Sequence, residues 1–370
     1  MKIIYIANIR IPTEKAHGIQ IMKMCEAFTN NGHDVELVVP WRINNLTQDP
    51  FEYYGLKGRF KIKRIFSWDL IKYGRFGFIM QSFTFGLSSF FYTLFNSVDI
   101  VFGRDELPLL FISFHHKVVW ETHTGSYNLS TKMLLKRCDI VVAITQGLKD
   151  FYMKNGVDGK KILVAPDAVD AEQFDINISM EEARTKLNLP KDKKIILYTG
   201  HLYDWKGAHI LAQAATLLPD TTAVAFVGGT DKDIQDFKTR FGAIPNILIL
   251  GKKPYEEMPL YLKAADILTL PNSPVNDVSS LYTSPMKLFE YMASGRAIIA
   301  SNLPSIREIL ETERNAILVE PDEPKLLAEG IKRIISDPAL DKRISDEAYK
   351  DSKLYTWLNR AQSIVSFIES

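Results

Sequence analysis

The sequence is poor in cysteine and in net charge. Among its 370 residues only Cys25 and Cys138 are cysteines, and they form no CxxC pair. This excludes a disulfide framework and a cysteine-based zinc site, and it suits a reducing compartment. Lysine and arginine number 45 against 44 for aspartate and glutamate, which leaves a net charge of +1. Because positive and negative charges are nearly equal in number, bulk binding of nucleic acid is not expected.

Signals for several other protein classes are also missing. The chain starts with MKIIYIANIR, a short β-type run without the basic region and long apolar region of a signal peptide. No HExxH, GxSxG or P-loop motif occurs, and no tandem repeat or low-complexity tract is present. We therefore expect a cytoplasmic, globular protein.

One segment tests that expectation. Phe76 to Phe95 contains no charged residue over twenty positions, a length that could cross a bilayer. It also contains Gln81, serines, threonines and two glycines, and a predicted strand follows at once. This composition favours a crossover helix that is buried against a sheet or faces a membrane, with a transmembrane helix as the less favoured alternative.

The rest of the chain alternates short β-rich runs with helical stretches. Ten runs are predicted as strands: KIIYIAN, DVELVVP, DIVFGR, KVVWETH, DIVVAIT, KIILYTG, AVAFVGG, ILILG, DILTLP and AIIAS. This alternation predicts parallel sheets with covered faces, and ten strands exceed one sheet of ordinary size. A polar run from Ile178 to Lys194 precedes a new strand, so we place a domain join near Val169 to Ile178. The predicted fold class is α/β, with two doubly wound, Rossmann-like domains and a cleft between them.

Ligands of such sheets bind beyond the carboxyl ends of the strands. Gly18 follows the first strand and precedes a helix, so its backbone could approach an anion or simply form a tight turn. His201 and Lys206 follow KIILYTG, where a cation suits a phosphate but could also be an ordinary surface residue. Lys287 and Glu290 follow DILTLP and lie three residues apart, so in a helix they share a face and could point to one ligand.

Most of the chain resembles a family 4-type glycosyltransferase of the GT-B fold. The matching C-terminal segments are YTGHLYDWKG, FVGG, LGKKPYEEMPLYLKAADILTLPNS and SPMKLFEYMASGRAIIASNLPSIREIL. Less specific matches in the first half are HGIQIMKMCEAFTNNGHDVELVV, VVWETHTG, CDIVVAITQGLKDFY and ILVAPDAVDAEQF. The tail YTWLNRAQSIVSFI resembles the helix that closes this fold. The resemblance implies an acceptor-binding domain at 1–172 with 355–370, and a nucleotide-sugar domain at 173–354.

The resemblance also implies roles for single residues. Glu290 would accept hydrogen bonds from the ribose hydroxyls, and Lys206 with Lys287 would neutralise the diphosphate leaving group. His123, in WETHTG, matches a histidine that approaches the donor sugar, although it could be a merely structural polar group at a strand end. These three basic residues, His123, Lys206 and Lys287, are the predicted catalytic groups. The remaining predicted donor contacts are Gly18, His201, Lys252, Pro254, Ser284, Met286 and Leu288.

The sequence departs from the family's common pattern at two places near the diphosphate and the sugar. His201 stands where an arginine is usual, and Tyr282 stands where a second glutamate usually holds a sugar hydroxyl; Asp277 could substitute for it. The pair Asp231 and Asp233 precedes a helix and is interpreted as capping, not as a metal site. We expect no metal and no cofactor.

The predicted function is a retaining glycosyltransferase of the hexosyltransferase type that uses a UDP- or GDP-sugar and a saccharide or lipid-linked acceptor in cell-surface glycan synthesis. Two alternatives remain: a sugar-nucleotide epimerase of the same fold, and a non-catalytic nucleotide-sugar-binding protein. The segment from Lys57 to Arg75 carries seven basic residues and one acidic residue, Asp69. It predicts peripheral contact with an anionic inner membrane face, or simply a solvated basic surface. No nucleic acid is expected as a partner.

Overall fold

A computed structural model describes residues 1–370, which form two compact units. Unit 1 comprises Met1–Pro166 together with Trp357–Ser370, and unit 2 comprises Asp167–Thr356. The boundaries that we expected, 172/173 and 354/355, differ from these by a few residues. Val169 belongs to unit 2 because it pairs with Thr356 in an isolated bridge, and its N–H donates to the carbonyl of Tyr355 at 2.9 Å.

Unit 1 is built on a seven-stranded parallel sheet in the order β3-β2-β1-β4-β5-β6-β7. Its strands are β1 (Lys2–Ile6), β2 (Asp34–Pro40), β3 (Lys61–Ile65), β4 (Ile100–Gly103), β5 (Val118–Thr122), β6 (Ile140–Ala143) and β7 (Ile162–Val164). The strand order reverses between β1 and β4, which is the topological switch point of a doubly wound sheet.

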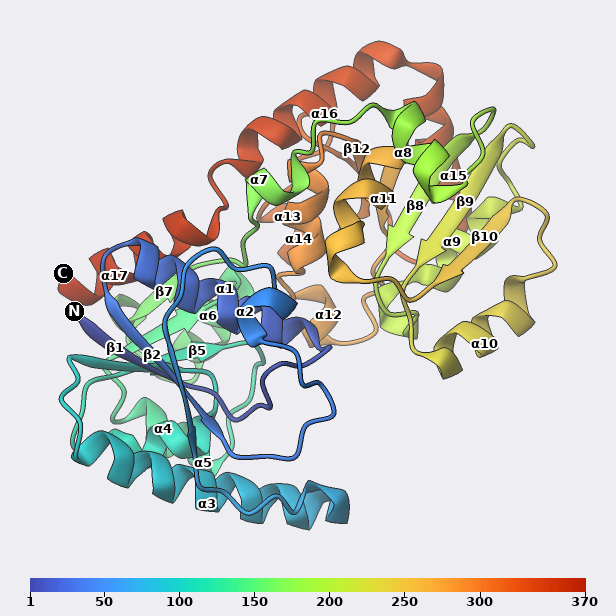
Figure 1. The fold of residues 1–370 in the computed structure, drawn as a ribbon. Coiled ribbons are helices and arrows are strands. Elements are labelled where there is room, and N and C mark those ends of the chain that lie inside the picture. The colour runs from blue at the N-terminus through green and yellow to red at the C-terminus, as the bar shows by residue number, and fades with distance from the viewer. The chain divides into compact units, whose positions relative to one another are not determined.

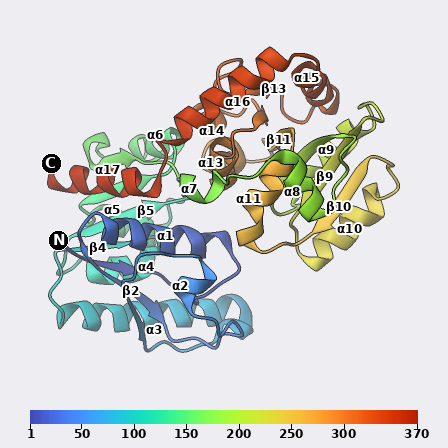
Figure 2. The same cartoon turned by 45° about the horizontal axis from the view of Figure 1, so that its top comes forward.

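Helices cover both faces of this sheet (Figures 1 and 2). They are α1 (Ala16–Asn30), α2 (Pro50–Tyr53), α3 (Gly74–Leu94), α4 (Glu106–Ile112), α5 (Leu129–Leu135), α6 (Gln146–Lys154) and α17 (Trp357–Glu369). α1 and α17 pack against each other on one side, whereas α3 packs against α4, and α4 against α5, on the other. The C-terminal helix therefore returns to the unit in which the chain begins.

Unit 2 repeats the plan with a six-stranded parallel sheet in the order β10-β9-β8-β11-β12-β13. Its strands are β8 (Lys194–Thr199), β9 (Thr222–Val227), β10 (Ile247–Gly251), β11 (Ile267–Leu270), β12 (Ala297–Ser301) and β13 (Ile317–Val319). Its helices are α7 (Ala171–Phe174), α8 (Met180–Leu187), α9 (Ala208–Ala215), α10 (Asp231–Phe241), α11 (Met258–Ala264), α12 (Asp277–Ser280), α13 (Met286–Ala293), α14 (Pro304–Arg307), α15 (Pro324–Ser336) and α16 (Pro338–Ser352).

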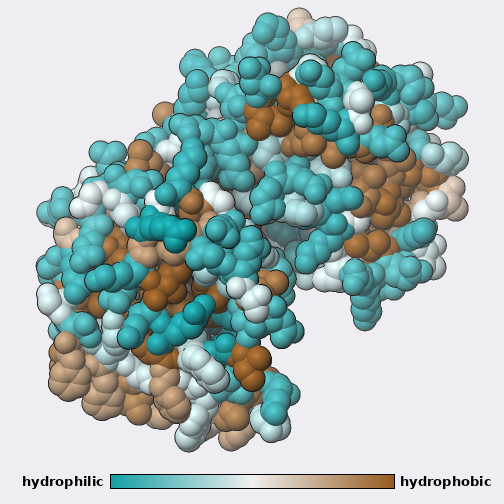
Figure 3. Space-filling view, viewed as in Figure 1, coloured by the Kyte–Doolittle hydropathy of each residue, from teal (hydrophilic) through white to brown (hydrophobic).

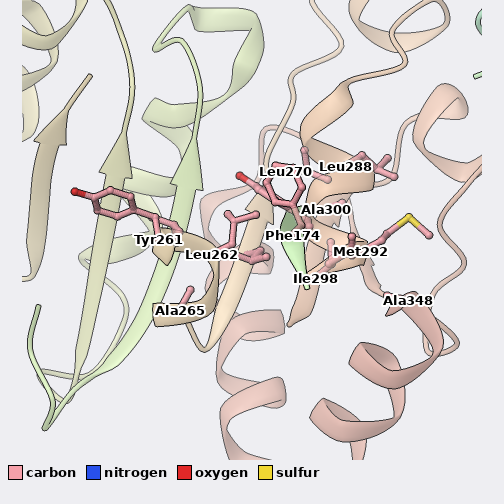
Figure 4. Packing of buried hydrophobic residues seen from close by; sticks show 14 of the residues in the cluster. Phe174, Tyr261, Leu262, Ala265, Leu270, Leu288, Met292, Ile298, Ala300 and Ala348 are labelled. Atoms are coloured by element: carbon pink, nitrogen blue, oxygen red, sulfur yellow. The ribbon is translucent and has the colours of Figure 1, made fainter. Parts of the chain in front are cut away.

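Helices cover both faces of the central strands of the unit 2 sheet, which explains why these strands are mostly apolar. Along β8, Ile195 and Leu197 face one core, while Ile196 and Tyr198 face the other. Figure 4 shows part of the first core, with side chains of α13 beside those of β12. The predicted α/β class with two Rossmann-like parallel sheets is confirmed.

The uncharged run at 76–95 lies almost entirely in α3, but the helix is not buried as a crossover helix usually is. Many of its large apolar side chains are exposed, among them Phe76 at 71% and Phe78 at 50%. No helix of the structure is long and apolar enough to cross a membrane. Of the two possibilities that the sequence left open, burial applies to only one side of α3, which is mainly polar apart from Phe85, while the other side is apolar and exposed.

Candidate functional site

In unit 2 the loops that follow β8, β9 and β10 are joined at the carboxyl end of the sheet. The N–H of Gly200 donates to the carbonyl of Val227, and that of Gly228 to the carbonyl of Gly251, both at 2.8 Å. Gly228 has φ +121°, and a Cβ there would lie 2.3 Å from the carbonyl oxygen of Gly200. Only glycine permits this approach, which brings the predicted donor-binding loops together at the switch point between β8 and β11.

Two lysines lie at this sheet edge, and no carboxylate is within ion-pair distance of either. Lys206 ends a 3-10 turn (η3, Asp204–Lys206), and its Nζ lies 3.8 Å from the ring centroid of Trp205. Lys287, in the first turn of α13, places its Nζ 3.0 Å from the carbonyl oxygen of Thr199 and 4.0 Å from the ring centroid of Tyr198.

The surroundings of both lysines disfavour the positively charged form of the side chain. Burial lowers the pKa of Lys206 to about 8. Burial, together with the charge of Lys206, lowers the pKa of Lys287 well below its ordinary value, against a smaller opposing effect of Glu290. Neighbouring cations with this little compensation are typical of a site that binds an anion.

Glu290 lies one turn further along α13 and is 7% exposed. Its Oε1 accepts a hydrogen bond from the Tyr255 hydroxyl at 2.9 Å. Burial raises the pKa of Glu290 to about 7, although the hydrogen bond from Tyr255 and the charge of Lys287 oppose this. Tyr255 starts the 3-10 turn η4 (Tyr255–Glu257) after β10, so the loop that contains the predicted donor contacts Lys252 and Pro254 also leads to the hydroxyl that holds this carboxylate.

The start of α13 supplies backbone donors beside these side chains. The first N–H groups of a helix have no partner within it, and here they belong to Met286 and Lys287. The next one, of Leu288, already donates to the carbonyl of Pro285 at 2.9 Å, and the Leu288 side chain lies in the core. The N–H of Leu288 is thus engaged within the helix start, and the N–H groups of Met286 and Lys287 are the donors that remain for the predicted anion contact. Ser284 uses its hydroxyl oxygen to accept from the N–H of Asp167 at 2.9 Å.

The remaining predicted donor contacts of unit 2 are exposed side chains. His201 stacks on Tyr203 with ring planes 3° apart. Burial lowers its pKa, the charge of Asp233 opposes this, and Lys206 lowers it further, so the ring is neutral near pH 7. Lys252 and Pro254 occupy the turn between β10 and η4. Asp277 is exposed at the start of α12, close enough to Tyr282 for its charge to raise the tyrosine's pKa, burial being the larger cause.

Two further polar residues of this region deserve comparison with the predictions. Asp233 forms a capping box with Thr230 at the start of α10, which confirms the capping interpretation for Asp233, while Asp231 is the first residue of the same helix. No group of three or more potential metal ligands occurs in the chain. Asn272 was missed: it follows β11, is fully buried, and neither side-chain polar atom has a hydrogen-bond partner. An asparagine directly after a buried strand was the signal in the sequence.

Unit 1 contains a different kind of cluster at the end of β5. Glu121 is fully buried and accepts from Gln20 Nε2 at 2.6 Å, from His123 Nε2 at 2.7 Å and from Arg360 Nη2 at 2.8 Å. Arg360, on α17, also donates to the carbonyl of Pro166 at 2.7 Å. Burial alone would raise the pKa of Glu121, but the charge of Arg360 and the hydrogen bond from His123 hold it well below its usual range.

The same surroundings keep His123 neutral. Burial and then the charge of Arg104 lower the pKa of His123 to about 4, and they outweigh the opposing effect of Glu121. The contact with Glu121 is thus a hydrogen bond from a neutral ring through Nε2, which leaves Nδ1 as the ring's acceptor. Of the predicted site residues of unit 1, His123 is therefore held in one tautomer.

Gly18 has a packing role that the sequence did not reveal. A Cβ there would lie 2.3 Å from the Tyr54 hydroxyl, and the Gly18 N–H already donates to the carbonyl of Lys15 at 2.9 Å. Close packing against Tyr54, and not a free backbone donor, accounts for this glycine. Arg104 was also missed; it follows β4 directly, and its Nη1 donates to Gln20 Oε1 at 2.8 Å.

Family models match nearly the whole chain in two parts. Residues 18–173 match the model described as Glycosyltransferase Family 4, and residues 179–351 match Glycosyl transferases group 1. The second part contains Lys206, Glu290 and their surroundings, and the first contains His123.

Individual relatives agree with this assignment. An uncharacterized glycosyltransferase of Methanocaldococcus jannaschii is 27% identical over 216 residues, which cover 56% of this chain and 53% of the relative. A D-inositol 3-phosphate glycosyltransferase of Corynebacterium urealyticum is 25% identical over 263 residues, 66% of this chain and 60% of the relative. The chain thus spans between half and two thirds of the length of these curated relatives.

The fold is matched by solved structures over its full length. The Anabaena protein HepE, in a crystal structure with UDP and glucose, superimposes with a TM-score of 0.79 at 17% identity and with 100% of each chain covered. Together, the two family models, the relatives and the two Rossmann-like sheets show that the chain belongs to the family 4-type glycosyltransferases of the GT-B fold.

Proposed function

We propose that this chain is a retaining glycosyltransferase that transfers a sugar, of hexose type, from a nucleotide-sugar donor to a saccharide or lipid-linked acceptor. One observation carries the proposal: Lys206 and Lys287 lie half-buried at the carboxyl end of the unit 2 sheet without a carboxylate in ion-pair distance, and Lys287 is one turn from Glu290 on α13. A diphosphate supplies the negative charge that this arrangement lacks, and ribose hydroxyls suit a carboxylate acceptor.

The reaction breaks the bond between the sugar C1 and the diphosphate oxygen and forms a bond between C1 and an acceptor hydroxyl oxygen. The nucleoside diphosphate leaves with the electron pair, and Lys206 and Lys287 stabilise its developing charge. The acceptor proton passes to an oxygen of the leaving phosphate, so front-face displacement needs no carboxylate nucleophile. The donor site requires no metal, because the two ammonium groups and the α13 N-terminus supply the positive charge.

In this proposal unit 2 binds the donor and unit 1 binds the acceptor. His123 accepts a hydrogen bond from a sugar hydroxyl through Nδ1, because its Nε2 is engaged by Glu121. The Anabaena neighbour was crystallised with UDP and glucose, and also with UDP-glucose, which favours a UDP-sugar as the first donor to test. Cell-surface glycan synthesis at the inner membrane face is the proposed setting, with the basic segment Lys57 to Arg75 in peripheral contact with anionic lipid.

Thermal unfolding in the presence of UDP-, GDP- and ADP-sugars tests the donor site, because a ligand of the folded state raises the melting temperature. NMR of the product made from the stabilising donor then tests retention of the anomeric configuration. Transfer with retention, undiminished by EDTA, is the expected result. Stabilisation without transfer to any saccharide or lipid-linked acceptor would indicate a binding protein, and conversion of the free donor would indicate an epimerase.

A further inference from the structure

Helix α3 has its polarity reversed relative to an ordinary surface helix. The side that faces unit 1 carries four buried polar residues, two glycines and a single large apolar side chain, namely Gln81, Ser82, Ser89 and Thr93, Gly77 and Gly86, and Phe85. Gln81 Nε2 donates to Asn8 Oδ1 at 2.7 Å, and the amide of Asn8 donates to Ser82 Oγ at 3.0 Å. A surface helix normally turns its apolar side inward and its polar side to water. Here hydrogen bonds attach the helix to unit 1, and the apolar side is turned out.

The outer side of α3 carries a continuous apolar stripe. Its members follow one another at intervals of three or four residues, so they lie along one face of the helix. The exposed fractions of these side chains are 71% for Phe76, 51% for Ile79, 46% for Phe83, 41% for Leu87, 48% for Phe91 and 48% for Leu94. The stripe is about 27 Å long at 1.5 Å per residue. In Figure 3 tan and brown atoms gather along the lower left border, where Figure 1 places the C-terminal half of α3.

Cations border this stripe at both ends. Lys72 and Arg75 are exposed at the start of α3. Lys63 and Arg64 of the edge strand β3 line a shallow groove together with Phe91 and Phe95, near the other end of the helix.

The acidic groups nearby are already engaged. The one carboxylate of the basic segment, Asp69, pairs with Arg42 at 3.6 Å and accepts from the N–H of Ile43 at 2.9 Å. Glu36 accepts from the Tyr92 hydroxyl at 2.8 Å. A hydrogen bond from a neutral hydroxyl leaves the charge of Glu36 in place, but the four cations outnumber it, so the border of the stripe is positive.

We infer that α3 is an in-plane docking helix for an anionic lipid surface. The apolar stripe enters the region between headgroups and acyl chains, while Lys63, Arg64, Lys72 and Arg75 bind lipid phosphates and carboxylates. An amphipathic helix with an aromatic face and basic neighbours fits this interface, where aromatic rings are favoured and each cation near the surface strengthens binding. A second copy of the chain fits less well, because a twofold contact through this stripe would oppose cations to cations in either helix direction.

This inference rests on the proposed function only for its purpose: it gives the peripheral contact a defined surface, whose core is α3 and not the basic segment alone. Its test needs no donor or acceptor. Transfer to a soluble saccharide is measured separately. If transfer fails while the protein still binds vesicles, the proposed function is overturned but the inference about the docking surface is not.

The test is co-sedimentation with vesicles of phosphatidylcholine, with and without phosphatidylserine. Wild type should bind the phosphatidylserine vesicles, and Phe83→Ser/Leu87→Ser/Phe91→Ser should lower its partition coefficient at least about tenfold. Lys72→Glu/Arg75→Glu should lower it comparably on phosphatidylserine vesicles only. The matched control Leu217→Ser removes a leucine of unit 2 that is 45% exposed, and it should bind like wild type.

All substituted residues are exposed, so the variants should fold, and a melting temperature within a few degrees of wild type checks this. Equal vesicle binding by wild type and the triple serine variant would overturn the inference. So would a wild-type dimer in light scattering that the triple variant abolishes, because a second copy would then occupy the stripe. Capture by phosphatidylserine vesicles that the serine and glutamate variants both lose would support it.

Discussion

The two units differ in whether the charged groups of their clusters are balanced by groups of the chain itself. In unit 1 the carboxylate of Glu121 is matched by Arg360 and by hydrogen bonds from Gln20 and His123, all from the chain itself. In unit 2 the ammonium groups of Lys206 and Lys287 have no carboxylate within ion-pair distance, and their pKa values are lowered. A self-neutralised cluster fixes geometry, whereas an unbalanced one favours an anionic ligand. Unit 1 thus fixes the orientation of His123, whereas unit 2 leaves positive charge that a diphosphate would balance in the proposed function.

The largest effect is expected where the matched pair of unit 1 is broken. Glu121→Leu removes the buried carboxylate that Arg360 Nη2 contacts, so the free energy of unfolding should fall by about 3–5 kcal/mol. Urea unfolding measures this. The double variant Glu121→Leu/Arg360→Met removes both charges and should recover most of the loss. If the free energy of unfolding falls less in the single variant than in the double variant, the ion pair between Glu121 and Arg360 does not balance the buried charge of unit 1.

The nucleotide contact of unit 2 should show the next effect. Glu290→Ala removes a charged hydrogen-bond acceptor for the ribose, so UDP binding should weaken by about 1–3 kcal/mol. Calorimetry on the free nucleotide measures it. Tyr255→Phe is the matched variant, because it removes only the hydroxyl that contacts Glu290. Unchanged affinity in Glu290→Ala would remove the ribose role.

The lysines should matter for turnover and not for folding. Lys206→Met should lower kcat/KM about tenfold, or 1.4 kcal/mol, through lost stabilisation of the leaving group. Its melting temperature should stay the same or rise, since the folded state disfavours this charge. The pKa of Lys206 is lowered in the folded protein, so this destabilisation is fully present below about pH 8 and disappears as pH rises toward 10.5. Near wild-type turnover together with lower stability would make Lys206 structural.

The smallest effect is a dependence of donor affinity on pH. Binding favours ionised Glu290, with a pKa of about 7, and protonated Lys206 and Lys287, whose pKa values are lowered, that of Lys206 to about 8. Affinity for UDP-glucose should therefore fall severalfold on each side of its maximum, as Glu290 takes up a proton at acid pH and as the lysines lose theirs at alkaline pH. The diphosphate diester does not titrate in this range. Glu290→Gln should flatten the acid limb and Lys206→Met the alkaline limb; a profile unchanged by both would contradict the comparison.

Much of the fold could be predicted because periodic apolar runs are local in the sequence. All ten predicted strands are present, while the short strands β3, β7 and β13 were missed. β7 and β13 have three residues each and lie at sheet edges, and KIKRI of β3 carries three cations on an edge strand. The orientation of α3 could not be predicted, because composition alone does not tell which side of a helix meets the sheet.

The candidate site, like the fold, has local features that the sequence predicted and long-range contacts that it did not. Lys287 and Glu290 are three residues apart, so their shared helix turn followed from spacing. Their long-range neighbours did not: Tyr255 is 35 residues from Glu290, and Arg360 is 239 residues from Glu121. No local sequence pattern predicts a hydrogen-bond partner that is so far away along the chain. The arrangement of the switch point required the strand order, which the sequence shows only through its resemblance to a family.

The return of α17 to unit 1 has a consequence for biosynthesis. Glu121 is translated long before Arg360, so a nascent chain that already contains every strand of unit 1 still lacks the guanidinium group that neutralises its buried carboxylate. Domains usually fold in the order in which they leave the ribosome. Here unit 2 can finish first, and unit 1 becomes complete only when the last helix emerges. A ribosome that stops before residue 360 releases a chain that cellular proteases can recognise as unfinished.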